Sequence, residues 1–205
     1  MKTSFKSGFT LIELLVVITI IGILIGIAVP TIGSALDRAN QMKDLSNIKQ
    51  AGTLLFVNAN DNNGKFFDRG ASTSEMFLEL WKDGGISTAA VLGGTGLPPI
   101  ENPDTSIPAD AIAWRYVKGL KTSSNPNMSL LISYGPLSSV EPLTKKAGAD
   151  VSSYTAENSL WGDKVVLAYY VGGNASRLTP DKDKKVQFTQ SDITVDTSVV
   201  QLLDR

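Results

Sequence analysis

The sequence contains no cysteine and no histidine among its 205 residues. Without cysteine there are no disulfides or thiol nucleophiles, and without histidine there is no imidazole to act as a general base or to bind zinc. Ordinary hydrolase and zinc chemistry are therefore disfavoured, and we do not expect an enzyme. A chain of this length can bury a sufficient core without disulfides, so their absence is compatible with a location outside the cytoplasm.

A surplus of positive charge is also missing. The formal net charge is −1 and the sequence pI is about 5.5. Nucleic-acid affinity depends largely on lysine and arginine that neutralise phosphates. We therefore expect no nucleic-acid partner.

The N-terminus combines a basic start with a long apolar run. Residues 1–8 carry Lys2 and Lys6 and no acid, and residues 9–29 are almost unbroken in their apolar character. An apolar helix needs about 20 residues to cross a hydrocarbon core about 30 Å thick. The run therefore predicts a single membrane span. The positive-inside rule places the N-terminus in the cytoplasm before processing and the rest of the chain in the periplasm or beyond.

Two simpler interpretations of this segment are a cleaved secretory signal peptide and an ordinary membrane anchor. Neither explains Glu13, because an ionisable residue within a span costs about 2.5–3.5 kcal/mol at mid-span and usually has a function. The small residues 33–35 could only be forced into a signal-peptide cleavage site, and the apolar run is long for a signal peptide. Glu13 therefore points to a specialised membrane segment.

Residues 6–24, KSGFTLIELLVVITIIGIL, closely resemble the class III signal of type IV prepilins and type II secretion pseudopilins. The resemblance implies that a prepilin peptidase cuts after Gly8 and methylates the new amine of Phe9. Glu13 matches the glutamate of that family, and Pro30 matches its proline near the end of the span. The implied partners are the peptidase, other pilin or pseudopilin subunits and an inner-membrane assembly platform. The implied product is a filament.

Physical chemistry gives these positions a consistent interpretation. The cleaved amine of Phe9 would lie in an apolar environment, where the Glu13 carboxylate of a neighbouring subunit could offset its desolvation. Gly22, Gly26 and Pro30 recur every four residues on one helix stripe, which suits close helix packing. Pro30 cannot donate a hydrogen bond to the carbonyl of Gly26, so we expect a bend or local melting between Gly22 and Pro30.

The remaining pattern predicts an α+β protein, a long helical spine packed on a small antiparallel β-sheet head, and this arrangement resembles that of pilins. We divide the chain into a leader (1–8), a transmembrane and filament-core helix (9–29), an amphipathic half of the spine (30–60) and a globular head (61–205). The predicted buried stripe of the spine repeats at helical spacing and includes Ile32, Leu36, Met42, Leu45, Ile48, Leu55 and Ala59.

Within the head, turn and strand signals predict the order of the elements. The spine ends in the breaker cluster at residues 60–64, and a capping box at Ser72 and Glu75 starts a short helix that two glycines end. Proline and glycine make residues 93–108 a loop. Strands are expected at residues 111–117, 130–134, 165–171, 186–189 and 195–203, with a hairpin turn at 172–174.

Two head segments carry a weaker resemblance. Residues 60–67 and 165–173 look like the multi-copy pseudopilin-type proteins of planctomycete and verrucomicrobial bacteria. Those relatives often have an Asp-Gly-His turn where this chain has Gly172, Gly173 and Asn174. No role is carried over to that turn.

Calcium is the one cofactor to be considered from the sequence, and its candidate ligands are Asp61, Asp181 and Asp183. An EF-hand aligned on Gly64 would require acids where the chain has Ala59 and Gly70, so we prefer solvated turns and expect no cofactor. Three tryptophans could form a ligand-binding surface, but core packing is the preferred interpretation; they are Trp81, Trp114 and Trp161.

The sequence therefore predicts a structural subunit of a type IV pilus-like or type II secretion pseudopilus filament. The alternatives are a membrane-tethered binding protein, whose head recognises a carbohydrate or a protein, and a tethered enzyme. No catalytic pair of side chains supports the enzyme. The sequence does not distinguish pilus from pseudopilus or a major from a minor subunit.

Overall fold

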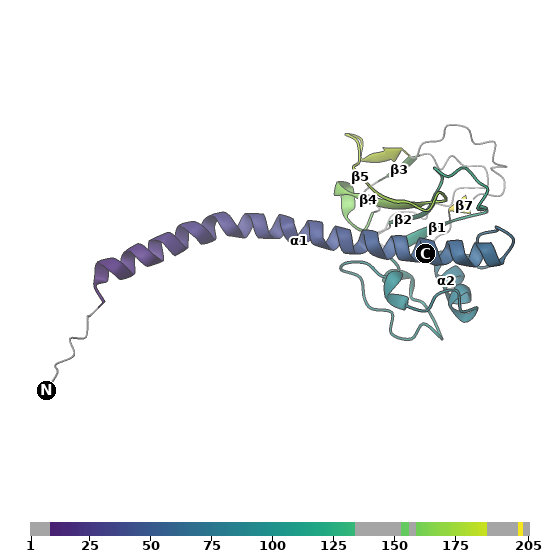
Figure 1. The fold of residues 1–205 in the computed structure, drawn as a ribbon, viewed down its shortest axis with the longest axis horizontal. Coiled ribbons are helices and arrows are strands. Elements are labelled where there is room, and N and C mark those ends of the chain that lie inside the picture. Colours follow the sequence, from purple (N-terminus) through teal and green to yellow (C-terminus); the bar gives the residue numbers. More distant parts are fainter. Residues whose placement is uncertain (1–8, 134–152, 156–158, 188–200, 203–205) are drawn as a thin grey trace. The chain divides into compact units, whose positions relative to one another are not determined.

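The computed structural model describes residues 9–133, 153–155, 159–187 and 201–202. The chain divides into two compact units, Met1–Gln41 and Met42–Arg205. Helix α1 (Leu11–Asp61) contributes residues to both (Figure 1).

Most of the part of α1 in the first unit is apolar and exposed. Its large aliphatic side chains have no cover within the single chain, with Leu11 87% and Ile27 66% exposed. The helix is long and apolar enough to cross a membrane. It is helical at every residue from Gly22 to Pro30, so the expected local melting is absent, and Figure 1 shows a curved rather than an interrupted ribbon.

In the second unit α1 lies between two layers (Figure 1). The β-sheet covers one side, and α2 (Thr73–Lys82) with its following loop covers the other. Ile48, Ala51, Leu55 and Ala59 are fully buried at helical spacing. The predicted stripe was too long, however, because Ile32, Leu36 and Met42 are more than half exposed.

The C-terminal end of α1 and the N-terminal end of α2 carry the caps that the sequence predicts. Beyond α1, Gly64 adopts a positive φ of 75° and its N–H donates to the carbonyl of Ala59 at 2.8 Å. Ser72 caps α2 by accepting from the Glu75 N–H at 3.2 Å. The Glu75 carboxylate reaches back to the Ala71 N–H at 2.8 Å, one residue before the cap.

The described strands form an antiparallel sheet in the order β5-β4-β2-β1-β7 and a separate antiparallel pair, β3 with β6. The α+β prediction is confirmed, with an architecture of the pilin kind. The strand bounds are β1 (Trp114–Lys118), β2 (Ser129–Ser133), β3 (Ser153–Thr155), β4 (Val166–Tyr170), β5 (Ala175–Leu178), β6 (Lys185–Gln187) and β7 (Gln201–Leu202).

One strand begins later than the sequence predicts because a short 3₁₀ turn precedes it. The expected strand at 111–117 begins at Trp114 because η2 (Ala109–Ala111) follows Pro108. Two further turns are η1 (Ala89–Val91) and η4 (Gly162–Lys164). The expected hairpin at 172–174 is confirmed, since it joins β4 to β5. Most of the expected strand at 195–203 lies outside the described residues.

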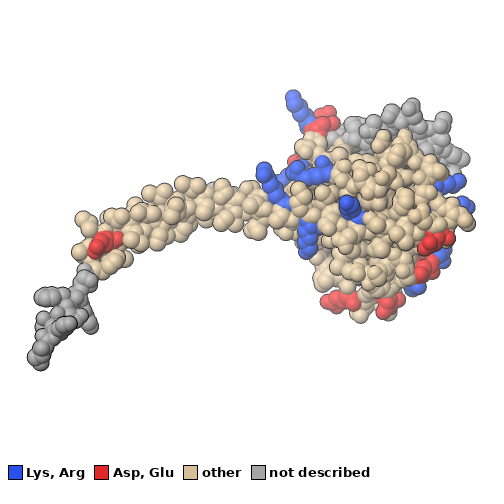
Figure 2. Space-filling model, in the orientation of Figure 1, with Lys and Arg blue, Asp and Glu red and all other residues tan. Residues whose placement is uncertain are grey.

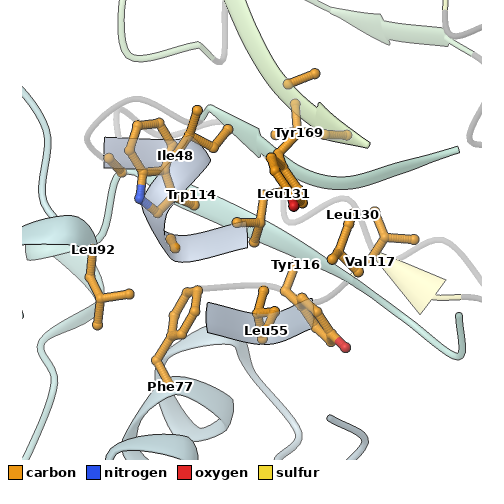
Figure 3. Packing of buried hydrophobic residues seen from close by; sticks show 14 of the residues in the cluster. Ile48, Leu55, Phe77, Leu92, Trp114, Tyr116, Val117, Leu130, Leu131 and Tyr169 are labelled. Atoms are coloured by element: carbon orange, nitrogen blue, oxygen red, sulfur yellow. The ribbon is translucent and has the colours of Figure 1, made fainter. Parts of the chain in front are cut away.

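Aromatic side chains of the sheet fill the space against α1 (Figure 3). Trp114 and Tyr116 are fully buried beside Ile48 and Leu55. Their polar atoms are satisfied, because Trp114 Nε1 donates to the Val91 carbonyl and Tyr116 Oη donates to the Phe67 carbonyl, each at 2.7 Å. This core fixes the second unit without a disulfide.

Candidate functional site

The candidate site is the start of α1, where Thr10 and Glu13 cap each other. The Glu13 carboxylate accepts hydrogen bonds from the Thr10 N–H at 2.8 Å and from the Thr10 hydroxyl at 2.6 Å. In return, the Thr10 hydroxyl accepts from the Glu13 N–H at 3.3 Å. This is a reciprocal capping box, with Thr10 as the N-cap.

The capping box gives Glu13 a role within its own chain. The first N–H groups of a helix have no partner inside the helix, and their exposure to lipid is costly. A carboxylate has about four acceptor sites, and Glu13 uses one oxygen for its two bonds with Thr10. Glu13 can therefore cap α1 and still accept a further bond from a cation, and the positive end of the helix dipole favours its charge.

The residues next to the predicted cleavage site lie outside the helix. Phe9 is 73% exposed and precedes Thr10, which itself precedes the first helical residue, Leu11. Gly8 lies outside the described residues. The structure therefore places the predicted methylation site and the predicted assembly carboxylate within one turn of the start of α1.

The predicted packing glycines have open space around them. A Cβ added at Gly22 or at Gly26 would meet no atom within 4 Å. Neither glycine is needed to avoid a clash within the single chain, so room remains for close approach of another helix. At Pro30 the backbone is helical. The roles predicted for these three positions remain predictions.

Two hydroxyls in the apolar part of α1 are satisfied locally. Thr19 donates to the Leu15 carbonyl at 2.7 Å, and Thr31 donates to the Ala28 carbonyl at 2.8 Å. These side chains therefore need no external partner in an apolar environment. Among the described residues 9–29, Glu13 is left as the one ionisable side chain.

The capping role of Thr10 was not predicted from the sequence, although the spacing of Thr10 and Glu13 is the pattern of a capping box. The pattern was missed because the apolar run begins at Phe9, before the helix itself begins.

The candidate calcium ligands do not converge in the described part of the chain. Asp61, Asp181 and Asp183 are all exposed. Across the described residues, no group of three or more acidic, histidine or cysteine side chains is arranged to hold a metal. Asp181 instead accepts a hydrogen bond from the Asp183 N–H at 2.9 Å, as in an ordinary turn.

The tryptophans have separate environments. Trp114 belongs to the core, as preferred from the sequence, whereas Trp81 and Trp161 are only partly buried. The indole N–H of Trp81 donates to Asp104 at 2.7 Å, and that of Trp161 donates to Asp44 at 3.2 Å. They therefore serve as links between segments of the second unit.

Asp44 is a buried carboxylate on α1 that lies outside the buried stripe predicted from the sequence. It accepts from the N–H and the hydroxyl of Thr95, both at 3.1 Å, and from Trp161. Burial raises the pKa of Asp44, although these hydrogen bonds and the nearby charge of Lys43 oppose the increase. The cluster joins α1 to two segments distant in sequence, and no feature of it suggests catalysis.

Comparison with known proteins identifies the N-terminal segment. Residues 4–29 match the family described as the prokaryotic N-terminal methylation motif. This motif is the class III signal of type IV pilins and pseudopilins. The match includes the Gly8–Phe9 bond, the capping box and most of the apolar part of α1. Neither the curated proteins nor the solved structures give a match to the chain.

Proposed function

We propose that this chain is the precursor of a filament subunit, either a type IV pilin or a type II secretion pseudopilin. The observation that carries the proposal is the methylation motif at residues 4–29, which coincides with an exposed apolar helix. In a single chain this helix buries none of its most apolar window. Such a surface needs lipid before assembly and other helices after it.

In this proposal the two units lie in different environments, the first in the membrane and the second in water. The apolar part of α1 anchors the precursor in the inner membrane, with its N-terminus in the cytoplasm. The second unit, whose core is closed around α1, folds outside the cytoplasm. Prepilin peptidase cuts between Gly8 and Phe9 and methylates Phe9, and an inner-membrane platform adds the subunit to others of its kind.

The capping geometry supports the role of Glu13 in assembly. Its carboxylate is already oriented by Thr10 at the start of α1. It retains acceptor sites for the cationic amine of Phe9 in an adjacent subunit. Pairing would offset the cost of burying both charges among apolar helices, and each charge would be destabilising without the other.

The mature N-terminus tests the proposal. We expect mass spectrometry of the protein from its own host to show a chain that begins at N-methylated Phe9. Gly8→Leu should leave the uncut precursor in the membrane, because the peptidase requires a small residue before the bond it cuts. Ser7→Leu makes the same change one position earlier and should still be processed. A wild-type chain that keeps residues 1–8 would contradict the proposal.

A further inference from the structure

The second unit carries acidic charge on one loop, and we define residues 97–110 as the acidic loop. No lysine or arginine occurs between Lys82 and Arg115. Glu101, Asp104 and Asp110 are exposed on the loop. Figure 2 shows acidic side chains along the lower edge of this unit, on the side where Figure 1 shows α2.

The acidic loop is ordered against α2. The Trp81 indole N–H donates to the Asp104 carboxylate, and the Ser74 hydroxyl donates to the Ile107 carbonyl, each at 2.7 Å. Ile107 is itself buried. A loop fixed in this way loses little conformational freedom on binding. Next to Glu101 it also exposes two rigid apolar residues, Pro98 and Pro99.

A face of α1 in the second unit has the complementary character, and we call it the exposed stripe. It consists of Met42, Ser46, Lys49, Thr53 and Val57, which are exposed at helical spacing, although Thr53 also forms a side-chain hydrogen bond with Tyr169 of β4. Lys43 lies beside it. Between residues 42 and 60 the one acid is Asp44, which is buried. Lys49 forms no ion pair with any described residue.

A filament requires two different surfaces on each subunit that fit one another. Subunits related by a helical operation meet head to tail, so one surface of each copy contacts another surface of the next. The exposed stripe offers lysine with Met42 and Val57, which are 60% and 54% exposed. The acidic loop offers carboxylates with two prolines. The two surfaces are therefore opposite in charge, and each also offers apolar residues to the other.

We propose that the acidic loop of one copy docks on the exposed stripe of α1 in the next copy. This inference rests on the proposed function as a filament subunit and names a contact between the second units of neighbouring copies. Lys43 and Lys49 lie opposite Glu101 and its neighbouring acids, while Pro98 and Pro99 cover Val57. Because exposed ion pairs are weak individually and screened by salt, the contact depends on many copies held together by their apolar helices.

Disulfide trapping provides a direct test, since the natural chain has no cysteine. Thr53→Cys in an epitope-tagged copy and Pro99→Cys in an untagged copy are co-expressed as full chains in the native host. We expect oxidised filaments to contain a tagged–untagged dimer. Asn127→Cys, in an exposed turn outside both surfaces, replaces Pro99→Cys as the control and should give at least about fivefold less dimer.

Charge exchange tests the electrostatic part of the contact. Lys49→Glu should reduce the Thr53–Pro99 dimer about fivefold, because an attractive pair becomes a repulsive one. Adding Glu101→Lys to the same chain should restore most of it. Both side chains are exposed, so neither change should disturb folding.

The outcomes separate this contact from the proposed function. Filaments with methylated Phe9 and no Thr53–Pro99 dimer would overturn the contact and leave the filament role intact. Equal dimer yields from Pro99→Cys and Asn127→Cys, or no effect of Lys49→Glu, would also overturn it. If the native host makes the Thr53–Pro99 dimer in its membranes but assembles no filament, the result would support the contact and contradict the filament role.

Discussion

Gly52 shows how one missing side chain determines packing in the second unit. It faces Tyr169, and a Cβ at this position would lie 2.2 Å from Cδ1 of the ring. The glycine lies mid-helix, where it costs about 1 kcal/mol relative to alanine. Close approach of β4 to α1 is therefore obtained at the expense of helix propensity.

We predict that Gly52→Ala lowers the free energy of unfolding of the second unit by about 1–3 kcal/mol, since overpacking forces the Tyr169 ring or the strand to move. Chemical denaturation of the full chain in detergent, followed by tryptophan fluorescence, measures the change. Gly33→Ala is the matched control, because its new Cβ meets nothing within 4 Å. Equal effects of the two substitutions would show that Tyr169 yields without cost.

The buried carboxylate of Asp44 should make stability depend on pH. Burial raises its pKa above the ordinary value of 3.8, so the folded state holds the proton at higher pH than the unfolded state does. The unfolding free energy therefore falls as the pH rises from about 3.8 through the raised pKa.

We predict that Asp44→Asn removes this dependence. Denaturation at a series of pH values should show the wild type losing stability relative to Asp44→Asn as the pH increases over that range. Asparagine supplies one acceptor oxygen where Thr95 and Trp161 use two, so the variant should also lose about 1–3 kcal/mol at low pH. A relative gain of the wild type with pH would mean that the hydrogen bonds outweigh desolvation.

At the scale of secondary-structure elements, the start of α1 is of most interest. Glu13 both caps the helix and carries a charge, and the two roles are separable by substitution. Glu13→Gln keeps a capping acceptor at the same position and removes the charge. Thr10→Ala removes the cap and leaves the charge.

We predict that Glu13→Gln and Glu13→Ala proteins are inserted and cut after Gly8 but enter filaments poorly. Insertion should improve slightly, because an ionisable group leaves the span. Thr10→Ala should still assemble. Filament yield after shearing, with membrane and N-terminal analysis of the same cells, measures each step. Wild-type yield from Glu13→Gln would contradict a charge pairing, and equal failure of Thr10→Ala would assign the defect to the cap.

The boundaries of the elements were predictable where a local signal specifies them. The capping box at Ser72, the glycine beyond α1 and the Gly172–Gly173 turn act within a few residues, and each was found in the sequence. Strand β3 was missed because its three residues are defined by their pairing with β6, which is distant in the chain. Pairing of this kind leaves little trace in local composition.

The motif at the candidate site was recognisable for the same local reason, with one omission. The residues around Gly8 and Glu13 form a continuous motif, whereas the capping role of Thr10 required the position of the first helical residue. The burial of Asp44 was not predictable, because periodicity places a residue on a face and does not say what covers that face. Here Thr95 and Trp161 cover it.

For the whole molecule, we predict that the chain separates into a soluble part and an apolar part. Removal of residues 1–33 should leave a monomeric protein with mixed helix and sheet and a cooperative thermal transition, since the described core begins beyond this segment. Circular dichroism and sedimentation measure both properties. Aggregation of the shortened chain in water would indicate that the apolar segment belongs to the fold.

In the proposed processing, the N-cap at Thr10 also affects how the peptidase can bind its substrate. A peptidase holds its substrate in an extended form and pairs with its backbone amides and carbonyls, which a helix would keep for itself. By starting the helix at Leu11, the cap leaves Phe9 outside the helix. The residue that stabilises the helix thus also marks a start for the helix beyond the bond that the peptidase is proposed to cut.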